Sequence, residues 1–143
     1  MTAIPPLLML IEGRRPRPRK APVSRPKEIV LHMAVAKMLR DHALPSWQWC
    51  HIPSGEARDI RTAVKLKQMG VRRGWPDLVL ISPAGLLHCL ELKRAGETLT
   101  VDQEAFQTWS IKNGVPYVVA YTIDEALVAL DVWGCLRIKI GGA

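Results

Sequence analysis

Two short apolar runs separated by three turn residues constrain this chain more than any other feature of its sequence. The runs are DLVLIS at 77–82 and LLHCLELK at 86–93, and Pro83, Ala84 and Gly85 lie between them. Runs of this length, rich in Leu, Val and Ile and bounded by Pro and Gly, predict two β-strands joined as a hairpin. The hairpin also determines which residues of the two strands face each other.

The other elements are predicted from helix caps and strand composition. Helices are expected at 26–42, 57–69, 101–113 and from Thr122 to near Gly134, and strands at 47–52, 115–121 and 135–140. The order α-β-α-β-β-α-β-α-β predicts the α/β class, with a mixed sheet flanked by helices. We expect a set of apolar side chains to face the core, namely Ile60, Ala63 and Val64 in the second helix and Trp47, Trp49, Trp109 and Trp133.

Charge divides the chain into an arm and a domain. The 143 residues carry a net charge of +7 and are 48% apolar, which suits one domain with a hydrophobic core. Residues 1–27 hold seven basic side chains and one acid, whereas 28–143 is nearly neutral, with 13 basic and 12 acidic residues. We therefore expect a flexible, basic Pro/Arg-rich arm at 1–25, a folded domain at 26–143 and a polyanionic partner.

The cysteines and apolar stretches exclude several classes. Cys50, Cys89 and Cys135 form no CxxC pair, which argues against a disulfide framework and a zinc site. No apolar run is long enough to span a bilayer, and the short one near the start is interrupted by Pro5 and Pro6. We expect a cytoplasmic protein without a membrane partner.

The hairpin brings two carboxylates together. A three-residue turn centred on Ala84 places Asp77 opposite Glu91, with Cβ atoms roughly 4.5–5.5 Å apart. Like charges at such positions destabilise a hairpin, and a bound divalent cation removes that cost. Mg²⁺ suits the site because it prefers oxygen ligands and commonly uses one or two carboxylates. Lys93 shares a strand face with Glu91, so an ammonium lies beside the pair, an arrangement that suits phosphodiester hydrolysis.

These residues resemble a known signature. The tripeptides WPD at 75–77 and ELK at 91–93 resemble the P-D…E-x-K motif of the PD-(D/E)XK nucleases. The phrase QMGVRRGWPDL at 68–78 is similar to the virus-type replication-repair branch, the VRR-Nuc domain. Gln103 matches a glutamine that this branch carries after E-x-K, and Glu28 matches an acidic residue of the first helix. The resemblance spans about 26–134.

The resemblance implies an αβββαβ core and a Mg²⁺-dependent deoxyribonuclease, with Mn²⁺ as a substitute and no other cofactor. It implies that Asp77, Glu91 and the Leu92 carbonyl hold the metal and that Lys93 acts at the nucleophile. It further implies a homodimer that resembles Holliday-junction resolvases, acts on branched or structured DNA and belongs to a bacterium or a phage-infected host cell. Glu28 and Gln103 would support catalysis.

Each supporting residue also has an ordinary structural explanation. Thr100 and Gln103 form a capping box, and a carboxylate such as Glu28 is favoured in the first turn of any helix. Basic residues near the motif can contact phosphates or can form a solvated face. We expect nucleic-acid contacts from Arg58, Arg61, Lys65, Arg72, Arg73, Trp75 and Arg94. The alternatives to an endonuclease are a non-catalytic nucleic-acid-binding module and a subunit that needs a partner.

Overall fold

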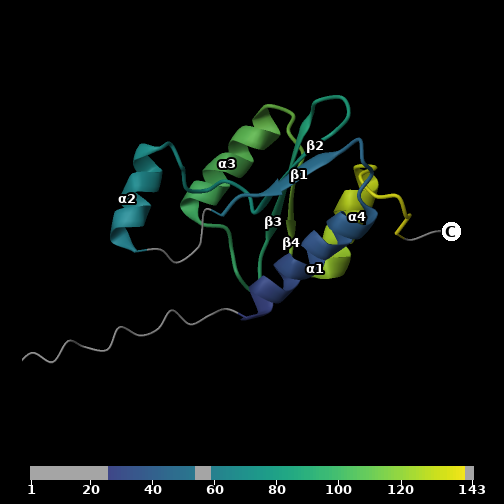
Figure 1. Cartoon of the computed structure of the whole chain (residues 1–143), viewed down its shortest axis with the longest axis horizontal. Coiled ribbons are helices and arrows are strands. Elements are labelled where there is room, and N and C mark those ends of the chain that lie inside the picture. Colours follow the sequence, from purple (N-terminus) through teal and green to yellow (C-terminus); the bar gives the residue numbers. More distant parts are fainter. Residues whose placement is uncertain (1–25, 54–58, 141–143) are drawn as a thin grey trace, which may run out of the picture.

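The computed structural model of the chain describes residues 26–53 and 59–140 (Figure 1). The expected arm at 1–25 and Arg58 lie outside these ranges. None of the helices within them has the length and apolar character of a membrane span. The elements in order are α1 (Pro26–His42), β1 (Gln48–His51), α2 (Ile60–Gln68), β2 (Leu78–Ile81), β3 (Leu87–Leu92), α3 (Val101–Lys112), β4 (Tyr117–Ala120) and α4 (Ile123–Val132).

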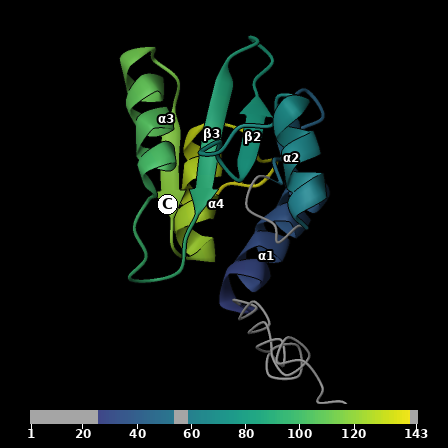
Figure 2. The same ribbon diagram turned by 90° about the vertical axis from the view of Figure 1, so that its left-hand side faces the viewer.

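The strands form one mixed sheet in the order β1-β2-β3-β4. β1 and β3 run antiparallel to β2, and β4 runs parallel to β3. α3 connects the two parallel strands and lies on one face of the sheet, whereas α1 and α4 lie on the other (Figures 1 and 2). The α/β class and the mixed sheet flanked by helices are therefore confirmed, with α2 inserted between β1 and β2.

Alternation along the strands decides which side chains enter the core. Leu78, Leu80, Leu90 and Leu92 share one face of the sheet and are fully buried. They pack with residues of α1 and α4, including Val35, Leu39, Ala126 and Leu130. The odd-numbered residues of the same strands face α3, and this face carries Glu91.

The turn between β2 and β3 has the predicted length and register. Leu78 pairs with Leu90 and Ile81 with Leu87. Gly85 donates a backbone hydrogen bond to the Ser82 carbonyl (2.8 Å) and adopts φ +78°, a conformation that glycine takes without steric cost. Continuing this register by one residue brings Asp77 opposite Glu91, as the sequence predicted.

Two predictions about the periphery were wrong. Residues 135–140 form no strand, because Leu136 makes an isolated bridge with Ala43 and no neighbouring strand continues the pairing. α2 buries none of its residues, and Ile60 and Val64 are exposed although they were expected to face the core. Figure 1 shows α2 standing away from the sheet.

The tryptophans divide between core and surface. Trp47 is buried, and Trp49 and Trp133 pack against the core as predicted. Trp47 and Trp133 both lie edge-on to the ring of His88, with centroids 5.0 Å away. The prediction for Trp109 was wrong, because this side chain on α3 is 49% exposed.

Gly74 sets the distance between the loop before β2 and the start of α3. Its φ is +85°, and a Cβ at this position would overlap the backbone of Asp102. We expect Gly74→Ala to destabilise the protein by a few kcal/mol, the sum of a left-handed backbone cost of about 1–2 kcal/mol and an overpacking cost of about 1–3 kcal/mol. Urea unfolding followed by circular dichroism measures this loss.

Gly85→Ala is the matched control. Gly85 also has a positive φ, but a Cβ there meets nothing within 4 Å. Gly85→Ala should therefore lower the free energy of unfolding only by the left-handed backbone cost, about 1–2 kcal/mol. Equal losses for the two variants would contradict a close approach between the loop and α3.

Candidate active site

Hydrogen bonds between β2 and β3 hold the two predicted carboxylates against each other. The Leu92 N–H donates to Oδ2 of Asp77 (2.8 Å), and the Asp77 N–H donates to Oε2 of Glu91 (3.2 Å). Each carboxylate is thus bound by the backbone of the opposite strand. This exchange fixes both side chains at the end of the hairpin without help from a flexible loop.

The backbone of Asp77 is held from β1 as well. Its carbonyl accepts hydrogen bonds from the Ile52 N–H (2.8 Å) and from Nδ1 of His51 (2.8 Å). A carbonyl can only accept, so Nδ1 of His51 carries the proton. The ring of His32 in α1 lies edge-on to His51, with centroids 4.2 Å apart. Sequence analysis missed this contact between His32 and His51. The available signal was that His32 lies four residues after Glu28 and therefore shares its face of α1.

Gln103 serves both as a capping residue and as a partner of Glu91. Its Oε1 accepts from the Thr100 N–H (2.9 Å) while its backbone N–H donates to the Thr100 hydroxyl (3.3 Å). Its Nε2 donates to Oε1 of Glu91 (2.6 Å). The predicted capping box is therefore confirmed, and the same amide also contacts Glu91.

Lys93 completes the trio. Its Nζ lies 3.7 Å from Oε1 of Glu91. Glu91 is 1% exposed and Lys93 is 8% exposed, so a carboxyl and an ammonium group lie together in a poorly solvated position. A buried charge has a high cost unless it is paired, and Lys93 offsets part of that cost for Glu91.

Burial raises the pKa of Glu91 to about 8, with a further contribution from the negative charge of Asp77. Lys93 acts in the opposite direction without cancelling the shift. Near neutral pH the carboxyl therefore holds its proton much more readily than an ordinary glutamate. Lys93 therefore does not fully compensate the cost of ionising Glu91 beside Asp77.

Other groups near Glu91 are unsuited to nucleophilic chemistry. Burial raises the pKa of the Cys89 thiol to about 12, so the thiolate is scarce. Burial, with the charge of Glu91 as a smaller cause, raises the pKa of the Tyr117 hydroxyl above its usual range. The odd-numbered face of β3 therefore offers carboxylate and ammonium chemistry rather than thiol chemistry.

The site fits a hard divalent cation with few protein ligands. In the described ranges no group of three or more His, Cys, Asp and Glu side chains is placed to hold a metal. Asp77 and Glu91 supply carboxylate oxygens, and Mg²⁺ commonly binds through one or two carboxylates and keeps several waters. The raised pKa of Glu91 shows the cost that such a cation would relieve.

The remaining predicted residues lie at varying distances from the trio. Glu28 lies in the first turn of α1, and no described hydrogen bond or ion pair joins it to Asp77, Glu91 or Lys93. Arg94 pairs with Glu97 through Nε (3.0 Å) and Nη2 (2.8 Å) to one carboxylate oxygen. The structure does not bring Arg61 and Lys65 to the trio, since both are exposed on α2.

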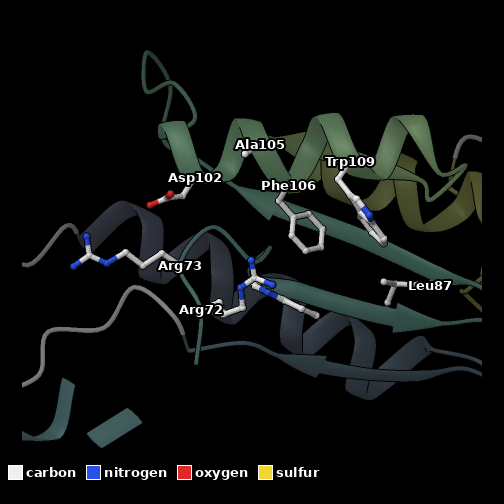
Figure 3. Close-up of a pocket in the computed structure, with 8 residues that line it drawn as sticks. Arg72, Arg73, Leu87, Asp102, Ala105, Phe106 and Trp109 are labelled. Carbon is white, nitrogen blue, oxygen red and sulfur yellow. The ribbon is translucent and has the colours of Figure 1, made fainter. Parts of the chain in front are cut away.

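Arg72, Arg73 and Trp75 line a groove between the loop before β2 and α3 (Figure 3). Its volume is about 470 Å³, and its other walls come from α3 and from the start of β3. The lining residues from these elements are Leu87, Asp102, Ala105, Phe106 and Trp109. The sequence indicated the basic residues and Trp75 but not the wall that α3 provides.

The raised pKa of Glu91 predicts how the free energy of unfolding depends on pH. In the unfolded chain a glutamate titrates near pH 4.3, and in the folded protein Glu91 titrates near pH 8. Between these values the folded state binds more protons, so the stabilising effect of the protonated group is lost as pH rises towards about 8. We expect the free energy of unfolding in EDTA to fall over this window by more in the wild type than in Glu91→Gln.

The difference between the two proteins should reach at least about 1 kcal/mol, since one pKa unit corresponds to about 1.4 kcal/mol. Urea unfolding at a series of pH values measures it, and histidines and other groups cancel in the comparison. Parallel pH profiles for the two proteins would show that Glu91 titrates normally.

The fold resembles that of a solved structure described as "VRR_NUC domain". The TM-score is 0.50 at 17% sequence identity, and the match covers 73% of this chain and 92% of that chain. The sequence matches no protein-family model and no curated protein. At this identity the likeness concerns the fold alone. The chain has a VRR-Nuc-like fold, with the mixed sheet and helices of a nuclease-like core.

Proposed function

We propose that this chain is a Mg²⁺-dependent endonuclease that hydrolyses phosphodiester bonds of DNA. The observation that carries the proposal is the pair of half-buried Asp77 and buried Glu91, with Lys93 beside it. Ionising both of these apposed carboxyls is costly in the free protein, and it becomes favourable when a cation binds between them. The VRR-Nuc-like fold supports the same reaction class.

Asp77 and Glu91 would hold the cation, together with the Leu92 carbonyl that the resemblance implies. When bound, the cation neutralises the phosphate and eases deprotonation of the attacking water. Lys93 is held within 3.7 Å of Glu91, where its ammonium can orient the nucleophile or stabilise developing charge. Gln103 fixes the orientation of the Glu91 carboxylate through the 2.6 Å hydrogen bond.

The finer parts of the proposal concern substrate and assembly. We propose structured or branched DNA as the substrate and a homodimer as the active form, both on the strength of the resemblance to junction-resolving nucleases. The net charge of +7 and the exposed Arg72 and Arg73 beside the site favour a polyanion. We place catalysis in the cytoplasm of a bacterium or phage-infected cell.

A non-catalytic nucleic-acid-binding module is the second candidate. The exposed basic residues Arg61 and Lys65 of α2 favour it, because they lie away from the trio and suit backbone contacts. The trio of Asp77, Glu91 and Lys93 opposes it, since a binding module gains nothing from two apposed carboxylates.

Substitution of the trio tests the enzyme directly. We expect Asp77→Asn, Glu91→Gln and Lys93→Met each to lower the cleavage rate of DNA by at least about 100-fold, the usual effect of removing one group that stabilises a transition state. The assay uses a labelled four-way junction and its linear duplex with Mg²⁺, and EDTA should stop cleavage of both.

Matched controls are available on α3. Glu104→Gln and Lys112→Met make the same chemical changes at exposed positions of the helix, so they should leave cleavage within about twofold. Full activity in all three trio variants would refute the proposed site. Salt-sensitive binding without Mg²⁺-dependent products would favour the binding module.

Gln103→Glu separates the two roles of this side chain. A glutamate at this position still completes a capping box with Thr100, so α3 should keep its stability. The amide donor to Glu91 is replaced by a third carboxyl. We therefore expect cleavage or Mg²⁺ affinity to fall about 10- to 100-fold, measured by Mg²⁺ titration of the rate. Unchanged kinetics would reduce Gln103 to a capping residue.

A further inference from the structure

The groove between the loop before β2 and α3 has a wall of aromatic rings. The ring centroid of Phe106 lies 5.2 Å from that of Trp75 and 5.7 Å from that of Trp109. Figure 3 shows Phe106 and Trp109 extending from α3 into the groove, with Arg72 facing them and Leu87 at the far end. The three rings therefore form one continuous surface from the loop before β2 to the middle of α3.

Two of the three rings in this wall remain exposed despite their packing against the protein. Trp109 is 49% exposed and Trp75 is 37% exposed. Asp102, Ala105, Phe106 and Trp109 recur at helical spacing, so one face of α3 is turned to the groove. A cluster of open aromatic side chains on a surface commonly marks a binding site.

The groove leads away from the candidate catalytic residues. Trp75 stands two residues before Asp77, and the first turn of α3 contains Gln103, which binds Glu91. From Gln103 to Trp109 the helix rises about 9 Å, comparable to two or three stacked bases at about 3.4 Å each. A strand with its phosphate at Glu91 can reach Trp109 within that length.

The charge of the groove fits a nucleic-acid strand. Arg72 and Arg73 are exposed on its lining, and Asp102 is the opposing charge, so the lining carries a net positive charge. Guanidinium groups next to open aromatic faces are the features that bind single-stranded nucleic acid, where phosphates meet the cations and bases stack on the rings. A duplex keeps its bases stacked on each other and offers no such face.

We propose that this groove binds unpaired nucleotides of the substrate strand next to the scissile phosphate, with Trp109 and Trp75 as stacking surfaces and Arg72 and Arg73 as phosphate contacts. The substrate class is then DNA with unpaired bases adjoining a duplex, in preference to fully paired DNA. This inference rests on the proposed function for the position of the cut.

Binding in EDTA tests the groove independently of cleavage. The full-length chain is titrated against a labelled duplex that carries a single-stranded extension of four thymidines, and against the same DNA with abasic residues in the extension. We expect the thymidine DNA to bind about 10-fold more tightly, within the range that base stacking on an aromatic side chain provides. Trp109→Ala should abolish the difference, and Trp109→Phe should keep most of it.

Ile111→Ala is the matched control, because Ile111 is 70% exposed on the same helix and does not line the groove. It should leave the thymidine preference unchanged, and circular dichroism should show that all variants are folded. Equal binding of thymidine and abasic DNA by the wild type would overturn the inference.

A cleavage arm separates this inference from the proposed function. If the wild type cuts both DNAs equally with Mg²⁺, the nuclease stands and the stacking subsite is refuted. If it cuts neither but binds thymidine DNA through Trp109, the subsite stands and the nuclease is refuted. If Trp109→Ala converts a dimer to a monomer in light scattering without altering base preference, the groove is an interface between copies and the inference is overturned.

Discussion

The exchange of hydrogen bonds between the ends of β2 and β3 is the interaction on which the site depends. The Leu92 N–H binds the Asp77 carboxylate, and the Asp77 N–H binds the Glu91 carboxylate. Backbone donors of one strand thus hold side chains of the other, so the position of both acids follows from the hairpin register. The leucines on the opposite face anchor that register in the core, since a slip by one residue would expose them.

Stability and chemistry are opposed at this position. The core face of the sheet gains free energy by removing Leu78, Leu80, Leu90 and Leu92 from water. The other face places Glu91 in a poorly solvated position beside a second acid, which raises its pKa to about 8. The two faces of one strand therefore have separate tasks, and the buried leucines offset the cost of the carboxylate.

Sequence reasoning succeeded where local rules are sufficient. The three-residue turn fixed the register of β2 and β3, and Thr100 with Gln103 fixed the start of α3. Sequence reasoning failed where the structure of a segment depends on another part of the chain packing or pairing with it. Within 26–53 and 59–140, residues 135–140 have strand composition but no neighbouring strand, and α2 has an amphipathic pattern but buries none of its residues. His32 lies against His51 of β1, and Trp109 lines a groove with Arg72 and Leu87, so elements distant in sequence decide the surroundings of both.

The double use of Gln103 has a consequence for motion. The first turn of a helix is ordinarily where fraying starts, because its N–H groups lack partners within the helix. In α3 that turn cannot open without breaking the contact from the Gln103 amide to Glu91. Local opening of the helix and loss of the Glu91 orientation are therefore one event, which makes the usually loosest part of a helix a rigid support. The aromatic face of α3 is carried on the same rigid unit.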